Sequence, residues 1–204
     1  MKSMLMLGVA GLVLATGCSS PRPKDHSRAL FNGIDLAGWV VEHGGEWSVE
    51  NGTLVGRNGQ DWSTNPEVSG SWLRTAREYG DFLLELDFAI DGNSGIMLRS
   101  GTERNPSFNG YEMQVLSDQG RAGGRYPTGS LYDVIAASRN MSKPTGEWNH
   151  VRILAEGSLI QVVLNGELVV DYANATRRAR GYIGLQNHDE KSVVRFRNIR
   201  ITEL

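Results

Sequence analysis

Apolar and polar residues alternate along much of the chain after residue 30. The segment 82–90 shows this most clearly, and its strongly apolar positions share one parity: Phe82, Leu84, Leu86, Phe88 and Ile90. Successive side chains of a strand point to opposite faces of the sheet, so a period of two predicts a strand with one apolar face. No segment of ten or more residues shows helical periodicity. The pattern therefore predicts a protein built mainly from strands.

Tight turns separate the predicted strands. Asn51-Gly52 follows Trp47 and Val49, and Asn165-Gly166 lies between two further apolar runs. Asn-Gly is favoured in two-residue hairpin turns, where both central residues need a positive φ. Ten or more short strands joined by such turns predict an all-β fold, a β-sandwich of two packed antiparallel sheets. The chain shows no repeat at fixed spacing, which argues against a propeller or a solenoid.

The last predicted strand changes its parity halfway along. Val194 and Phe196 are apolar at even positions, whereas Ile199 and Ile201 are apolar at odd positions. A regular strand would place one of these pairs on the wrong face. We therefore predict a β-bulge near residues 197–198.

Composition limits the remaining possibilities. The 204 residues suffice for one sizeable core but not for two ordinary domains, and the 25 glycines suit a fold with many turns. The net charge of −2 argues against binding of nucleic acid, which requires a basic surface. Because Cys18 is the only cysteine, a disulfide within the chain is impossible.

The N-terminus has the layout of an export signal. Lys2 precedes a short apolar segment over residues 4–15, and small residues lead to Cys18. This arrangement resembles a bacterial lipobox, in which the cysteine is lipidated. We expect a lipoprotein signal peptide at 1–18, a flexible tether at 19–28 and one domain at 29–204. Ser19 favours the outer membrane, facing the periplasm, over the inner membrane.

Strand parity places several polar side chains on one face. If alternate apolar residues of the central strands face the core, the residues between them face the opposite way. A carboxyl group, a guanidinium, three amides and an imidazole are then expected on a common surface: Glu112, Arg99, Asn93, Gln114, Gln186 and His188.

An ordered series of motifs resembles the 3-keto-disaccharide hydrolase family over residues 29–204. The motifs are Leu30-Phe31-Asn32-Gly33 with Gly38-Trp39, Tyr79-Gly80-Asp81-Phe82, Gly92-Asn93-Ser94-Gly95-Ile96 with Arg99, Gly110-Tyr111-Glu112-Met113-Gln114, Gly129-Ser130-Leu131-Tyr132, Lys143-Pro144 with Trp148, Leu164-Asn165-Gly166, Gly181-Tyr182-Ile183-Gly184-Leu185-Gln186 with His188, and Arg195-Phe196-Arg197-Asn198-Ile199. The resemblance implies a concanavalin A-like jelly roll that holds saccharide on its concave face and rim loops. Two positions depart from the family pattern, Met113 and Asp189.

The resemblance also implies a substrate, a 3-keto-glycoside or 3-keto-disaccharide produced upstream by a sugar 3-dehydrogenase. A ketone at C3 acidifies the proton at C2, so one base, one acid and a stabiliser of the enolate suffice for cleavage. The chain lacks a clear pair of carboxylates for ordinary glycoside hydrolysis, since Ala89 stands where a Glu-x-Asp-x-Glu strand would carry its third acid. We therefore predict Glu112 and His188 as base and acid, in either order.

Substrate binding is assigned to residues of the strands and of the two long loops, 56–70 and 117–147. The candidates are Asn93, Arg99, Gln114, Gln186, Tyr132, Lys143 and, for stacking on a sugar ring, Trp62.

Three alternatives stay open at this point. Glu112, His188 and nearby amides are also suited to hold a divalent cation that polarises the ketone, although no tight ligand-spacing motif is present. A noncatalytic carbohydrate-binding jelly-roll lipoprotein is the second reading of the same fold. A purely structural envelope lipoprotein is the third, and it leaves the long loops unexplained.

Overall fold

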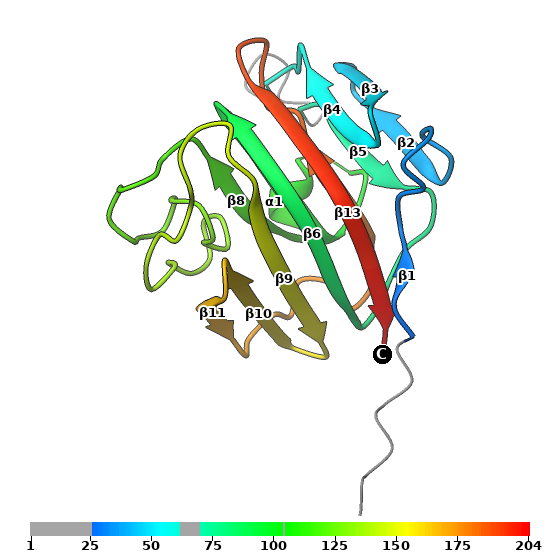
Figure 1. Ribbon diagram of the computed structural model, residues 1–204. Helices are drawn as coiled ribbons and strands as arrows, with labels where there is room; N and C mark the ends of the chain where they lie inside the picture. Colours follow the sequence, from blue (N-terminus) through cyan, green and yellow to red (C-terminus); the bar gives the residue numbers. More distant parts are fainter. Residues whose placement is uncertain (1–25, 62–69, 104) are drawn as a thin grey trace, which may run out of the picture.

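The computed structural model describes residues 26–61, 70–103 and 105–204. The predicted signal peptide, the predicted lipidation site Cys18 and the predicted stacking residue Trp62 lie outside these residues. The strands of the described part form two sheets (Figure 1). They are β1 (Arg28–Ala29), β2 (Trp39–Glu42), β3 (Glu46–Glu50), β4 (Thr53–Arg57), β5 (Trp72–Thr75), β6 (Phe82–Asp91), β7 (Asn93–Ser100), β8 (Tyr111–Leu116), β9 (Asn149–Glu156), β10 (Leu159–Leu164), β11 (Glu167–Tyr172), β12 (Tyr182–Gln186) and β13 (Val193–Glu203).

The larger sheet has eight strands and the smaller has five. In the larger sheet the order is β11-β10-β9-β6-β13-β4-β3, with β1 paired to β13, and in the smaller it is β2-β5-β12-β7-β8. Every pairing between these strands is antiparallel. The all-β, two-sheet jelly roll predicted from the sequence is thereby confirmed.

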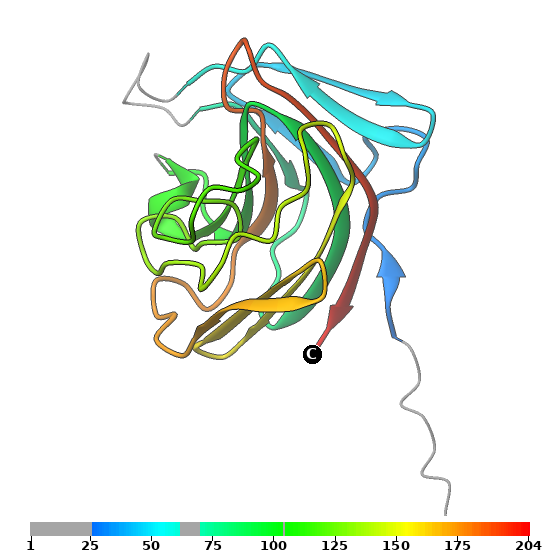
Figure 2. The ribbon, with the colours of Figure 1, turned by 60° about the vertical axis from the view of Figure 1, so that its left-hand side comes forward.

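The core lies between the two sheets. On the five-stranded sheet, cross-strand neighbours Leu73, Leu185, Ile96 and Met113 are fully buried and belong to it. The residues between them point to the other face, away from the eight-stranded sheet. In Figure 2 the short helix α1 (Pro106–Asn109) and the loops of 117–147 lie on this side of the five-stranded sheet. This second face carries the candidate site.

The predicted irregularity of β13 is a β-bulge. The register with β6 shifts between Arg197 and Arg200, and Asn198 has a φ of 54°. Asn198 Nδ2 donates a 2.7 Å hydrogen bond to Asp87 Oδ2, which holds the extra residue in place. The bulge turns both apolar halves of the strand into the core, as the sequence predicted.

A second bulge, which the sequence did not indicate, lies where β7 pairs with β12. Ser100 is opposite Tyr182 and Met97 is opposite Gly184, so Leu98 and Arg99 together face Ile183. Arg99 has a φ of 50°. The alternation of side chains along β7 therefore ends before Arg99.

Candidate active site

A small polar pocket opens on the second face of the five-stranded sheet. Its volume is about 50 Å³, enough for part of a sugar ring but not for a disaccharide. β7, β8, β12 and the segments next to them supply its lining: Asn93, Asn105, Ser107, Glu112, Gln114, Tyr132, Gln186 and His188.

The register of the sheet explains why these side chains meet. On β8, Gln114 lies opposite Gly95. On β12, Leu185 pairs with Ile96, so the next residue, Gln186, lies beside Gly95 on its other side. Gly95 therefore stands between two amides and leaves space above the sheet. The Glu112 side chain fills that space, since a Cβ on Gly95 would lie 1.9 Å from Glu112 Oε1. Only glycine is compatible with this position of the carboxyl group.

Glu112 is the buried acid of the pocket, with 3% of its surface exposed. Burial raises the pKa of Glu112 to about 7, although a hydrogen bond with the Ser107 side chain acts in the opposite direction. A carboxyl group with a pKa near neutrality is suited to accept or donate a proton at physiological pH.

His188 is held by the neighbouring carboxylate. His188 Nδ1 lies 2.8 Å from Asp189 Oδ2. Burial favours a higher pKa for Asp189, but hydrogen bonds with His188, Ser192 and the Lys191 amide outweigh it and lower that pKa, so the group is ionised. An ionised carboxylate only accepts hydrogen bonds, so Nδ1 of His188 is the donor. This leaves Nε2 as the imidazole nitrogen available for chemistry.

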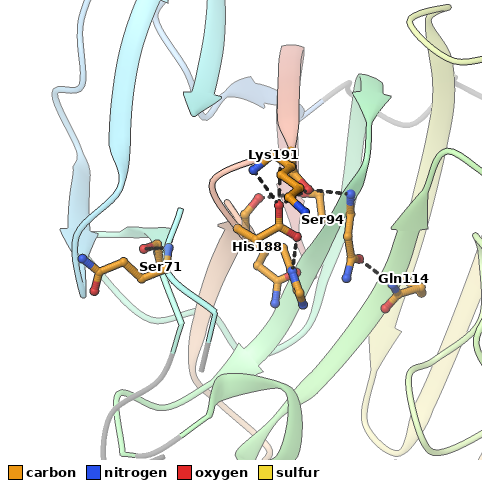
Figure 3. A network of polar contacts seen from close by, with 10 residues as sticks. Ser71, Ser94, Gln114, His188 and Lys191 are labelled. Atoms are coloured by element: carbon orange, nitrogen blue, oxygen red, sulfur yellow. Dashed lines mark hydrogen bonds and ion pairs between the residues drawn. The ribbon is translucent and has the colours of Figure 1, made fainter. Parts of the chain in front are cut away.

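A chain of hydrogen bonds joins the two sides of the pocket (Figure 3). Gln114 Nε2 donates to Asn93 Oδ1 at 2.8 Å, and the backbone N–H of Asn93 donates to Ser192 Oγ at 2.9 Å. Ser192 Oγ in turn donates to Asp189 Oδ1 at 2.9 Å, the carboxylate that holds His188. The amides and the imidazole are thus positioned as one unit before any substrate arrives.

One amide of the pocket keeps a free acceptor. Gln186 Oε1 is buried and has no hydrogen-bond partner among the described residues. A buried polar atom without a partner carries a desolvation penalty of about 1–3 kcal/mol. A ligand hydroxyl that enters the pocket would relieve this penalty by donating to Gln186 Oε1.

Tyr132 forms one wall because a loop segment extends the sheet. The Tyr132 amide donates to Glu112 O at 2.8 Å, and Leu131 is bridged to Met113. This covers the open edge of β8. Burial, and then the charge of Glu112, raise the pKa of the Tyr132 phenol, which therefore stays protonated as a hydroxyl donor.

Of the nine residues predicted for catalysis and substrate binding, the structure brings six into this pocket: Glu112, His188, Asn93, Gln114, Gln186 and Tyr132. Lys143 is exposed in the loop before β9 and does not line it. Trp62 lies outside the described residues.

The prediction that Arg99 binds substrate is wrong. The bulge in β7 turns its side chain away from the pocket, and that side chain is fully buried. Arg99 donates to Gly80 O at 2.8 Å and to Gly157 O at 2.7 Å, and pairs with Asp81 at 2.7 Å. It therefore ties two turns to the sheet and has a structural role.

Asn105 and Ser107 are pocket residues that the sequence analysis missed. The Asn105 side chain caps α1 by accepting from the Ser107 amide at 2.9 Å, with Pro106 at the start of the helix. An Asn-Pro pair is a recognisable start signal for a helix. It does not reveal that so short a helix folds back over Glu112.

A larger open hollow of about 720 Å³ adjoins the pocket. Its lining is Gly59, Gln60, Asp61, Asp189, Glu190 and Lys191. Asp189, which contacts His188, is part of this lining. None of the lining residues is a buried acid or a buried amide. The small pocket is therefore the stronger candidate for an active site.

No group of three or more His, Cys, Asp or Glu side chains in the described part of the chain is arranged to hold a metal ion. Glu112 and His188 are the two groups of this kind in the small pocket. Any cation bound there would need further oxygen ligands from the amides of Asn93, Gln114 or Gln186.

The fold belongs to the jelly rolls that include carbohydrate-binding proteins. The carbohydrate-binding module CBM66 from Bacillus subtilis shares it, with a TM-score of 0.59, 22% identity, and coverage of 81% of this chain and 96% of that chain.

Residues 26–202 match the family described as the 3-keto-alpha-glucoside-1,2-lyase-like domain. The chain belongs to this family, as its sequence motifs predicted. A 3-keto-disaccharide hydrolase of Bacteroides thetaiotaomicron is 25% identical to this chain, and the match covers 90% of this chain and 80% of that protein. The crystal structure of a candidate glycosyl hydrolase from Parabacteroides distasonis has a TM-score of 0.71 and 26% identity, and the match covers 87% of this chain and 99% of that chain.

Proposed function

We propose that this protein is a glycoside hydrolase-type enzyme that cleaves 3-keto-glycosides, including 3-keto-disaccharides. The observation that carries the proposal is the pairing, in one small pocket, of a buried acid and an imidazole held by a carboxylate. Burial raises the pKa of Glu112 to about 7, and His188 contacts Asp189 at 2.8 Å. Family membership and the name of the Bacteroides relative support the same substrate class.

The reaction begins with Glu112 acting as the base. Its carboxylate removes the proton from C2, and the electron pair moves toward the C3 carbonyl to form an enolate. The side-chain amides of Asn93, Gln114 and Gln186 position the sugar and stabilise the oxygen that becomes negative.

Cleavage follows by elimination. The enolate reforms the ketone, the C1–O bond breaks, and a protonated His188 gives its Nε2 proton to the leaving oxygen. Asp189 stabilises the charged imidazole in that role. In the second half of the reaction His188 takes a proton from water as the water oxygen bonds to C1, and Glu112 returns its proton to C2. Both side chains regain their starting states, and the overall result is hydrolysis.

The Glu112→Gln substitution tests this proposal because it keeps the shape of the side chain but removes the base. We expect turnover of a 3-keto-disaccharide to fall by about 10²–10⁴-fold, the contribution of general-base catalysis. Purified protein is incubated with the substrate, with and without chelator, and products are identified by mass spectrometry. The ascending limb of the wild-type pH–activity profile should lie near pH 7, where Glu112 loses its proton.

Glu167→Gln, an exposed position on β11, is the matched control and should keep full activity. Unchanged turnover in the Glu112 variant would exclude Glu112 as the base. If the wild-type protein binds glucosides but never converts 3-keto sugars, the noncatalytic carbohydrate-binding reading is correct instead. Loss of activity with chelator would assign part of the catalysis to a bound cation.

We further propose that the protein works at the cell envelope, anchored to the outer membrane through a lipid on Cys18 and facing the periplasm. The support is the N-terminal sequence alone: Lys2, the apolar segment 4–15 and the small residues before Cys18. No helix among the described residues is long and apolar enough to cross a membrane. A sugar 3-dehydrogenase must act upstream to supply the oxidised substrate.

A further inference from the structure

Three aromatic side chains form a connected cluster at the mouth of the small pocket, and we call this cluster the aromatic shelf. Tyr132 lines the pocket itself. The Phe108 ring centroid lies 6.0 Å from that of Tyr132, and the Tyr126 centroid lies 5.5 Å from it on the loop side. The shelf therefore extends from Tyr132 in the pocket wall to two rings outside the pocket lining.

The two outer rings of the shelf are open to solvent. Phe108 is 45% exposed and Tyr126 is 43% exposed, whereas Phe82, Phe88 and Phe196 are fully buried. Exposed apolar side chains are unremarkable when they are scattered, but a connected group beside a polar pocket marks a binding surface.

The shelf is held in place before binding. Asn105 caps the helix that carries Phe108, and the Tyr126 hydroxyl lies 3.3 Å from Asp133 Oδ1. Asp133 also pairs with Arg125 at 2.8 Å. Rings fixed in this way lose little conformational entropy when a ligand covers them.

The size of the pocket indicates what the shelf contacts. A volume of about 50 Å³ holds the reacting part of one ring, so the second unit of a disaccharide has to lie outside. The faces of aromatic rings are electron-rich and attract the polarised C–H groups of a pyranose ring. The position and chemistry of the shelf both suit such a ring.

We propose that Phe108 and Tyr126 form a subsite for the leaving sugar of a 3-keto-disaccharide, next to the pocket that holds the oxidised sugar. This inference rests on the proposed function, because it takes the reacting ring to lie beside Glu112. It goes further by naming the side chains that would contact a sugar aglycone.

The test compares two ligands that differ only in the aglycone, a 3-keto-disaccharide and the corresponding methyl 3-keto-glucoside. We expect Phe108→Ala and Tyr126→Ala each to weaken disaccharide binding by about 2- to 10-fold, the contribution of one aromatic contact. Binding and turnover of the methyl glycoside should stay within twofold of the wild-type values. Dissociation constants are measured by calorimetry and turnover by product analysis.

Two control variants show whether the effect is specific to the shelf. Ile34→Ala removes an apolar side chain that is 79% exposed and absent from the pocket lining, so it should change the binding of neither ligand. Glu190→Ala alters the adjoining hollow, the second place with room for a leaving sugar. Weaker disaccharide binding by Glu190→Ala, without an effect of the shelf variants, would overturn the proposal.

Other outcomes separate the shelf from the proposed function. Equal losses for both ligands in the shelf variants would show that the shelf does not discriminate the aglycone, and would overturn the subsite. If the wild-type protein turns over neither ligand, the proposed catalysis fails. The dissociation constants of the two ligands would then still decide whether the shelf binds the second sugar.

Discussion

Glu112 shows how one residue couples stability to function. In the unfolded chain the Glu112 carboxyl group has a pKa near 4.5, whereas burial in the folded pocket raises that pKa to about 7. The folded state therefore binds the proton more tightly than the unfolded state does. The resulting stability is fully present below pH 4.5 and is lost as the pH rises to about 7.

A measurable consequence follows for the free energy of unfolding. A shift from 4.5 to about 7 corresponds to roughly 3 kcal/mol, at 1.36 kcal/mol per pH unit. The Glu112→Gln variant carries no titrating group, so its stability relative to wild type should increase by that amount between pH 4.5 and pH 8. Urea unfolding of both proteins at the two pH values measures it. A constant difference between the proteins would contradict a raised pKa at this position.

At the scale of strands and loops, the site depends on one position without a side chain. Gly95 of β7 lies beneath the Glu112 carboxyl group, and a Cβ there would approach Glu112 Oε1 to 1.9 Å. We expect Gly95→Ala to displace Glu112 and lower turnover by about 10²-fold, the usual effect of moving a catalytic group by an ångström. Overpacking should cost only about 1–3 kcal/mol of stability, so the fold survives.

Turnover and thermal stability of Gly95→Ala are measured to check this expectation, with Gly80→Ala as the control. A Cβ on Gly80 meets no atom closer than 3.8 Å, so that variant should keep both stability and turnover. Wild-type turnover in Gly95→Ala would show that the position of Glu112 is not critical.

At the scale of the whole molecule, the alternation of apolar residues predicted the sandwich because packing of two sheets selects one face of every strand. The same alternation predicted which side Glu112, Gln114 and Gln186 occupy, and the parity change in the last strand predicted its bulge. It failed for Arg99, because the bulge in β7 arises from pairing with β12 and leaves no mark in the local pattern. Ser107 was missed because its place depends on how a short helix folds over the sheet.

Location in the cell is the remaining property of the whole molecule, and its support is the sequence alone. A lipid on Cys18 would hold the domain at a membrane surface through the residues between Cys18 and β1. We expect Cys18→Ala to abolish incorporation of labelled fatty acid and to move the protein from the membrane fraction to the soluble fraction. The purified domain should keep its turnover, because the pocket lies within residues 93–188.

Ser20→Ala, next to the same signal, is the matched control and should remain lipidated. Equal fractionation of wild type and Cys18→Ala, without incorporated label, would contradict the anchor and favour plain secretion.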